Sequence, residues 1–162
     1  MAIDYFLRID GISGESLDAK HKGEIEVESW SWGEANPVPP GGSGSGGGAG
    51  KVQMQDFNFT MKVNKASPLL FQYCANGKHI KNAILSCRKA GEKQQDFLIW
   101  TFEDLLISKY ETSGSGHTDV LPLDSVAVNF TKVSIEYKQQ KPDGSLEGGV
   151  KKGYDLKKAE SF

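Results

Sequence analysis

Residues 24–32 read Glu-Ile-Glu-Val-Glu-Ser-Trp-Ser-Trp. Ile25 and Val27 alternate with the glutamates, which is typical of a β-strand with one buried face. Trp30 and Trp32 then fall in register with the glutamates, so the apolar face changes sides within one run. A strand with such a change of face must bulge, twist strongly or leave one sheet for another.

The same change of face recurs twice further along the chain. Val52 and Met54 keep one register, whereas the apolar positions between 57 and 63 keep the other. Between residues 126 and 137 the register changes again after Phe130. Strands that bend at the corners of a barrel or orthogonal sandwich produce this pattern. We therefore predict a mainly β fold, a two-sheet β-barrel-like sandwich.

Further strands are predicted at residues 3–9, 83–88, 97–110 and 150–157.

One short α-helix is predicted to accompany the strands. Ser67 can cap it, Pro68 suits its first position and Gly77 suits the left-handed residue after its end. Leu70 and Cys74 share one face at helical spacing. Because a helix of about three turns is marginal alone, this face must pack on the sheets.

Size and charge restrict the class of protein. The 162 residues suit a single domain spanning residues 1–162, and the formal net charge of −2 argues against electrostatic binding of nucleic acid. No stretch approaches the roughly 18 apolar residues of a membrane span, so we expect no membrane insertion. Asp4 and Arg8 interrupt the first apolar run, so we do not expect a secretory signal there.

A Pro- and Gly-rich run at about residues 36–51 forms a long loop between two predicted strands. Hairpin loops are usually two to five residues long, and glycine loses the most conformational entropy on ordering. Such a loop is explained if something outside the subunit binds it. Its candidate contact residues are Pro37, Pro39, Pro40, Gly41, Gly44, Gly47 and Gly50.

The Gly-rich run does not match a nucleotide site. A phosphate-binding P-loop needs glycine six residues before the lysine and Ser or Thr after it, but Ser45 and Val52 stand at these positions around Lys51. The run also leads into a predicted strand, so no helix N-terminus follows to bind a pyrophosphate. We predict no cofactor.

Metal-binding and catalytic patterns are also missing from the sequence. His21, His79 and His117 have no histidine or cysteine at i+3 or i+4, and no serine lies in a G-x-S-x-G turn. Cys74 and Cys87 are too few for a disulfide framework, and we expect both to be reduced. A cysteine nucleophile stays open at this point, because sequence does not fix spatial neighbours.

An ordered set of short motifs resembles the Hcp family (hemolysin-coregulated proteins), which are tube subunits of bacterial type VI secretion. The resemblance covers essentially the whole chain. The matching motifs are Gly14-Glu15-Ser16, Trp30-Ser31-Trp32-Gly33, a Gly-rich loop ending Gly50-Lys51, Ser67-Pro68-Leu69, Cys74, Gly77-Lys78-His79, Arg88-Lys89-Ala90-Gly91, Val133 to Tyr137 and Pro142-Asp143-Gly144.

The resemblance implies a non-enzymatic structural subunit. It implies homohexameric rings that stack into a tube inside a contractile sheath, with sheath, baseplate and spike proteins as partners. It also implies that small effectors are held and protected in the ring lumen. Such a protein assembles in the cytoplasm and is then secreted to the extracellular space or a target cell without a signal peptide.

Site residues follow from this resemblance as expectations. Ser31 is the candidate lumen residue that faces effectors, and the Gly-rich loop is the candidate ring-stacking contact. Trp30 and Trp32 are expected to be core or subunit-interface anchors. Two alternatives stay open, namely a phage-like tail tube subunit without an effector role and an uncharacterised β-barrel hydrolase.

Overall fold

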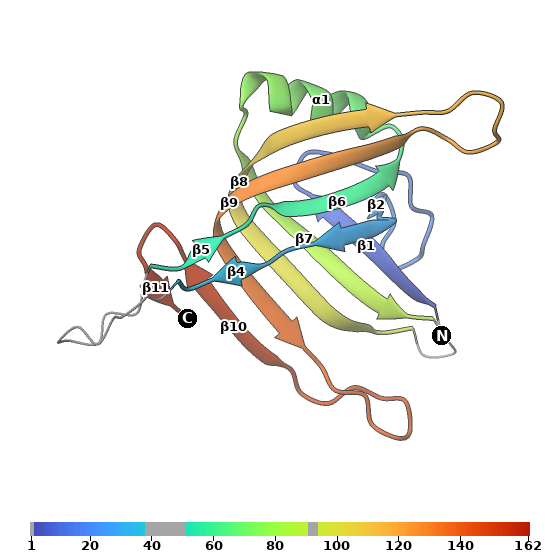
Figure 1. Ribbon diagram of the computed structural model, residues 1–162. Helices are drawn as coiled ribbons and strands as arrows, with labels where there is room; N and C mark the ends of the chain where they lie inside the picture. The colour runs from blue at the N-terminus through green and yellow to red at the C-terminus, as the bar shows by residue number, and fades with distance from the viewer. Residues whose placement is uncertain (1, 38–50, 91–93) are drawn as a thin grey trace.

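The computed structural model describes residues 2–37, 51–90 and 94–162, and within these ranges it is mainly β with one short helix (Figure 1). The fold class predicted from the sequence is therefore confirmed. No helix in the described ranges is long and apolar enough to cross a bilayer. The elements are β1 (Ile3–Ile9), β2 (Ile25–Glu26), β3 (Ser29–Ser31), β4 (Glu34–Ala35), β5 (Gln53–Met54), β6 (Phe57–Lys62), α1 (Ser67–Asn76), β7 (Ile80–Lys89), β8 (Asp96–Ser113), β9 (Leu123–Tyr137), β10 (Val150–Asp155) and β11 (Glu160–Ser161).

The large antiparallel sheet closes on itself because the segment 25–31 has two partners. β2 pairs with β1, and β3 pairs with β6. Between these ladders the amide of Val27 donates to the carbonyl of Tyr5 at 3.0 Å, and the amide of Glu28 donates to the carbonyl of Thr60 at 2.9 Å. The change of face predicted in this segment is thus the point where the strand changes partners.

The other two predicted changes of face have the same origin. β5 pairs with β4 in a small separate sheet, and the chain enters the large sheet at Phe57 as β6. β9 pairs with β6 over residues 123–128 and with β10 over residues 132–137. In each case the side-chain register shifts where one pairing partner is exchanged for another.

Part of the sheet extends beyond the barrel. We call this part the sheet extension; it comprises residues 96–102 of β8, 132–137 of β9, and the strands β10 and β11. It lies toward the bottom of Figure 1, away from the α1 end. On one side of the sheet extension β8 pairs with β7, so the sheet continues into the barrel. On the other side β10 and β11 form a sheet edge.

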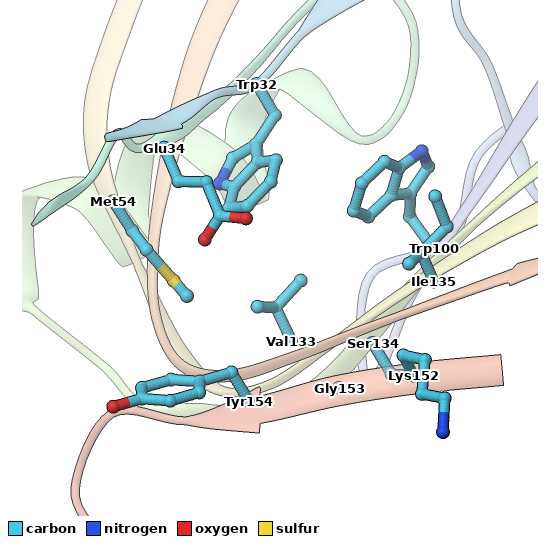
Figure 2. Close-up of a pocket in the computed structure, with 10 residues that line it drawn as sticks. All are labelled: Trp32, Glu34, Met54, Trp100, Val133, Ser134, Ile135, Lys152, Gly153 and Tyr154. Carbon is cyan, nitrogen blue, oxygen red and sulfur yellow. The ribbon is translucent and has the colours of Figure 1, made fainter. Parts of the chain in front are cut away.

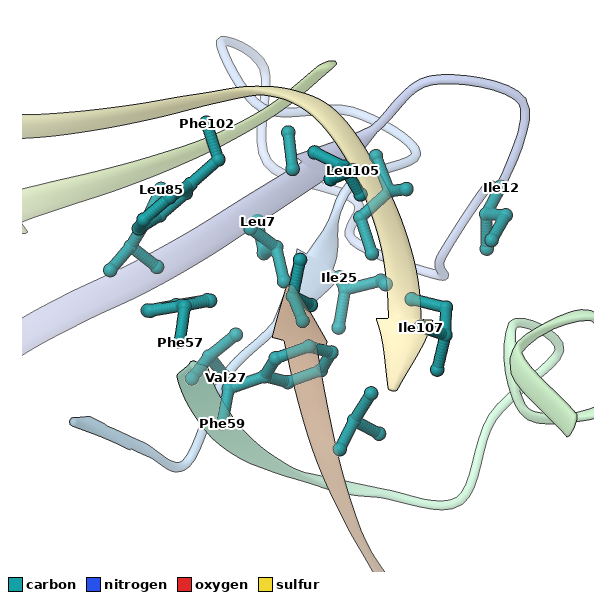
Figure 3. Close-up of a cluster of buried hydrophobic side chains, with 14 of the residues drawn as sticks. Leu7, Ile12, Ile25, Val27, Phe57, Phe59, Leu85, Phe102, Leu105 and Ile107 are labelled. Atoms are coloured by element: carbon teal, nitrogen blue, oxygen red, sulfur yellow. The ribbon is translucent and has the colours of Figure 1, made fainter. Parts of the chain in front are cut away.

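The core fills the barrel with large apolar side chains from both halves of the chain (Figure 3). Phe57, Phe59 and Phe102 are at most 1% exposed, and the ring centroids of Phe57 and Phe102 are 4.6 Å apart. Leu7 and Ile25 are also fully buried. Because apolar and polar residues alternate along the strands, the apolar side chains point into the barrel and pack as one continuous core.

The helix begins differently from the prediction. Ser67 is not the N-cap; Ala66 occupies that position, without a side-chain cap. The Ser67 hydroxyl instead donates to the buried carboxylate of Asp124 at 2.6 Å and accepts from the amide of Asn64 at 3.1 Å. The side chain of Asn64 accepts from the Ala66 amide at 2.8 Å and closes the preceding turn. Gly77 has the predicted left-handed conformation, with φ 64°.

The connection between β1 and β2, residues 10–24, is held together by backbone hydrogen bonds within it. The amide of Gly14 donates to the carbonyl of Gly23, and the amide of Ser16 donates to that of Glu24. A β-carbon on Gly14 would lie only 2.5 Å from the carbonyl oxygen of Glu24. The Gly14-Glu15-Ser16 motif therefore permits a close backbone approach.

A buried guanidinium also holds this connection. Arg88 on β7 is 3% exposed and donates to the Asp18 carboxylate at 2.8 Å. This hydrogen bond lowers the pKa of Asp18 to about 2. The Arg88 guanidinium also lies 4.8 Å from the Phe6 ring centroid, while His21 stacks on the same ring at 4.5 Å. The connection is therefore part of the packed structure.

Candidate functional site

The segment predicted to carry the site lies at the junction of the two sheets. Trp30 and Trp32 are half-buried and pack against the core, whereas Ser31 between them is exposed. The Trp30 ring lies 6.0 Å from that of Tyr5 and 6.3 Å from that of Trp100, measured between centroids. β3 thus directs the Trp30 indole inward and Ser29 and Ser31 outward.

Trp32 follows β3 and contacts two other aromatic rings. Its centroid lies 5.2 Å from Trp100 on β8 and 6.2 Å from Phe130 on β9. The indole nitrogens of Trp32 and Trp100 are both buried, and neither has a hydrogen-bond acceptor within the described part of the chain. Both of these indole donors are therefore unsatisfied within the described part of the chain.

Trp32 and Trp100 line a pocket of about 280 Å³ between the small sheet and the sheet extension (Figure 2). Its remaining lining residues are Glu34 and Met54 from the small sheet, Val133, Ser134 and Ile135 from β9, and Lys152, Gly153 and Tyr154 from β10. Figure 2 shows the Met54 side chain and the Tyr154 ring on opposite sides of the hollow. The pocket is thus mostly apolar and aromatic, with few polar groups.

Strand register explains how distant residues meet in this pocket. Trp100 pairs with Ile135 across β8 and β9, and Ile135 pairs with Lys152 across β9 and β10. On the other side, Glu34 pairs with Met54 across β4 and β5. Residues opposite each other in antiparallel ladders share one face, so each sheet presents a row of side chains to the hollow.

The two charged residues that line the pocket, Glu34 and Lys152, lie at opposite edges of it in Figure 2. Glu34 is exposed and lines the pocket, and no ion pair joins its carboxylate to a residue in the described ranges. The Lys152 ammonium lies at the opposite edge of Figure 2, directed away from Glu34. No histidine or cysteine belongs to the described lining. This arrangement favours binding rather than nucleophilic or acid–base catalysis.

The cysteine nucleophile left open by the sequence has no support in the fold. Cys87 is completely buried, and burial raises the pKa of its thiol to about 12. A thiol with this pKa is protonated near neutral pH and is a poor nucleophile. Cys74 is half-buried on α1 and packs against the core.

Of the predicted loop contacts, only Pro37 lies within the described residues, and it does not line the pocket. Pro37 is exposed at the end of the described stretch after β4. The remaining loop residues Pro39, Pro40, Gly41, Gly44, Gly47 and Gly50 lie outside the described residues. Sequence reasoning missed Glu34, Met54, Trp100 and Tyr154 as pocket residues, because only strand register places them around one hollow.

Residues 6–137 match the family model described as "Type VI secretion system effector, Hcp". The chain belongs to the Hcp family. Its sequence is 46% identical to "Protein hcp1" of Pseudomonas aeruginosa strain PAO1 over 159 residues, covering 97% of each chain. The resemblance inferred from the sequence is therefore confirmed.

Two solved structures show the same Hcp fold. Hcp1 from Salmonella typhimurium is 38% identical and superposes with a TM-score of 0.80, with each chain covered completely. A structure titled as a type six secretion system protein superposes with a TM-score of 0.92 at 27% identity, covering 99% of this chain and 100% of the other. The agreement extends to essentially the whole described fold.

Family membership settles the broad class. Hcp proteins are a structural family secreted through type VI secretion, and they are not enzymes. The alternative of a β-barrel hydrolase is therefore wrong.

Proposed function

We propose that this Hcp protein is the subunit of hexameric rings that stack into the tube of a type VI secretion system. The rings carry and protect small effectors in their lumen, and the protein is assembled in the cytoplasm before export. Sheath, baseplate and spike proteins are its partners in this proposal. The observation that carries it, beyond family membership, is an apolar face on the sheet extension that the described chain leaves partly open.

The open face follows from strand register. Leu98, Tyr137 and Val150 stand in one row across β8, β9 and β10. Tyr137 is 48% exposed and Val150 is 66% exposed. Apolar side chains gathered at a sheet edge favour burial against another chain, and an open edge risks uncontrolled association.

A second exposed apolar group lies near the hairpin that joins β8 and β9, at the end of the molecule opposite β10 (Figure 1). It consists of Val63, Val120, Leu121 and Leu123. Two different patches on one subunit are what a closed ring requires, because each copy presents one patch to each neighbour.

The mass of the native protein tests ring formation. Six chains of 17.7 kDa weigh about 106 kDa, so light scattering on the size-excluded protein is expected to give this value. Negative-stain images of the same peak should show closed rings with a central hole. A monomer that persists at high concentration would contradict the proposal.

A matched pair of variants locates the interface in the same experiment. Val150→Glu puts a charge on the apolar row and is expected to shift the mass toward the monomer. Lys151→Glu puts the same side chain at the adjacent position, which faces the other side of the strand, and serves as the control.

Effector carriage is assigned to Ser31, which is exposed on β3 between two half-buried tryptophans. A small hydroxyl there leaves a shallow polar surface that suits weak binding of varied cargo. Ser31→Gln is expected to reduce effector co-purification several-fold while ring mass is unchanged. Ser115→Gln, in the β8–β9 hairpin, is the control. Equal cargo retention by all three proteins would remove Ser31 from the proposed site.

Stacking of the rings is assigned, from the sequence, to the Gly-rich loop at about residues 36–51. A tail tube subunit without an effector role shares the predicted rings, so effectors recovered inside the rings distinguish it from the secretion tube proposed here.

A further inference from the structure

We propose that the pocket between Trp32 and Tyr154 binds a basic side chain, arginine or lysine, of another polypeptide. All residues that line the pocket come from one subunit, and Trp100, Ile135 and Lys152 lie on the same face of the sheet extension as the row proposed for the ring contact, so the pocket borders that contact. The pocket differs from the effector contact assigned to Ser31, whose side chain does not line this pocket.

The walls of the pocket suit the long apolar stem and cationic head of such a side chain. Trp32, Trp100 and Tyr154 supply aromatic surface, and Met54 and Val133 supply aliphatic and thioether surface (Figure 2). Aromatic faces attract arginine and lysine cations through the ring quadrupole, most strongly for tryptophan. The stem of the same side chain buries its methylene groups against apolar atoms.

Charge selects a basic occupant over a purely apolar one. Glu34, an exposed residue that lines the pocket, contributes a carboxylate that has no ion-pair partner in the described ranges. A guanidinium or ammonium group at this position would form a charge-assisted hydrogen bond with Glu34. An apolar occupant would instead reduce the hydration of the carboxylate without giving it a partner, which is costly.

The size of the pocket suits one inserted side chain. The volume of about 280 Å³ is at the lower limit of the roughly 300–1,000 Å³ typical of pockets for drug-sized ligands. One inserted side chain needs no more space than this.

The test compares arginine amide with citrulline amide, which has nearly the same shape but no charge. Each is titrated into the ¹⁵N-labelled native protein while the indole N–H signals of its three tryptophans are followed by NMR. We expect saturable shifts of the Trp32 and Trp100 signals with arginine amide, and at least about five-fold weaker binding of citrulline amide. Lysine amide should behave like arginine amide.

Variants test whether the Glu34 carboxylate causes the preference for arginine amide over citrulline amide. Glu34→Gln is expected to weaken arginine amide binding at least about five-fold and to leave citrulline amide binding unchanged. Glu160→Gln, an exposed change on β11 outside the pocket, should leave both unchanged. Light scattering on each variant confirms an unaltered assembly state. Equal binding of the two amides by the native protein, no binding of either, or an unchanged affinity in Glu34→Gln would overturn the proposal.

Discussion

Replacing Phe102 by alanine is expected to lower the free energy of unfolding by about 3–5 kcal/mol. Phe102 is completely buried, and its ring centroid lies 4.6 Å from that of Phe57 and 4.9 Å from that of Phe130. It stands on β8 between Ala83 of β7 and Val133 of β9. Strands on both sides fix the backbone, so the barrel cannot collapse fully into the cavity that alanine leaves.

Urea denaturation at one fixed protein concentration measures this loss, because assembly would otherwise change the apparent stability. Phe71→Ala is the matched control. Phe71 is 62% exposed on α1 and makes an edge contact with Tyr110. Its replacement is expected to cost less than about 1 kcal/mol. Similar losses in the two variants would show that Phe102 is not a central core residue.

Replacing Gly14 by alanine is expected to destabilise the fold by about 1–3 kcal/mol, the usual cost of overpacking. The new β-carbon would lie 2.5 Å from the carbonyl oxygen of Glu24 and 2.7 Å from the α-carbon of Ile25. These are backbone atoms that cannot rotate away. Ile25 is also fully buried and paired with Leu7, so relief of the clash would disturb the closure of the barrel.

A glycine-to-alanine change at an uncrowded position serves as the control for Gly14→Ala. Gly116→Ala places a β-carbon with no atom within 4 Å, and it is expected to change stability by less than about 0.5 kcal/mol. Proteolysis of the 10–24 connection under native conditions gives a second readout, since a displaced connection is cleaved faster. Equal stability of Gly14→Ala and the native protein would contradict the close approach.

The strands were predictable from sequence where alternation alone decides the outcome. The change of face between Val27 and Trp30 predicted a strand that bulges or changes sheet, and the structure shows a change of pairing partner there. The two later changes of face have the same explanation. Apolar side chains must face the buried interior of the barrel. A strand that changes its pairing partner therefore shows a shift in which alternate positions are apolar.

Capping was predicted less well. Serine is a preferred N-cap residue, but the hydroxyl of Ser67 donates a hydrogen bond to Asp124, which is 57 residues away in sequence. Local helix rules cannot anticipate a buried carboxylate delivered by another strand. Asp124 also accepts from the Tyr110 hydroxyl at 3.0 Å, and desolvation together with this contact raises the pKa of Tyr110.

The sequence by itself determined the fold class, the positions where strands change partners, and the family, because these depend on periodicity and on ordered local motifs. Only the tertiary structure decided which side chains surround the pocket. Trp32, Trp100 and Tyr154 come from three separate parts of the chain, and antiparallel register between β8, β9 and β10 brings two of them together. Register is set by long-range pairing, and a shift of one residue would turn Trp100 to the opposite face.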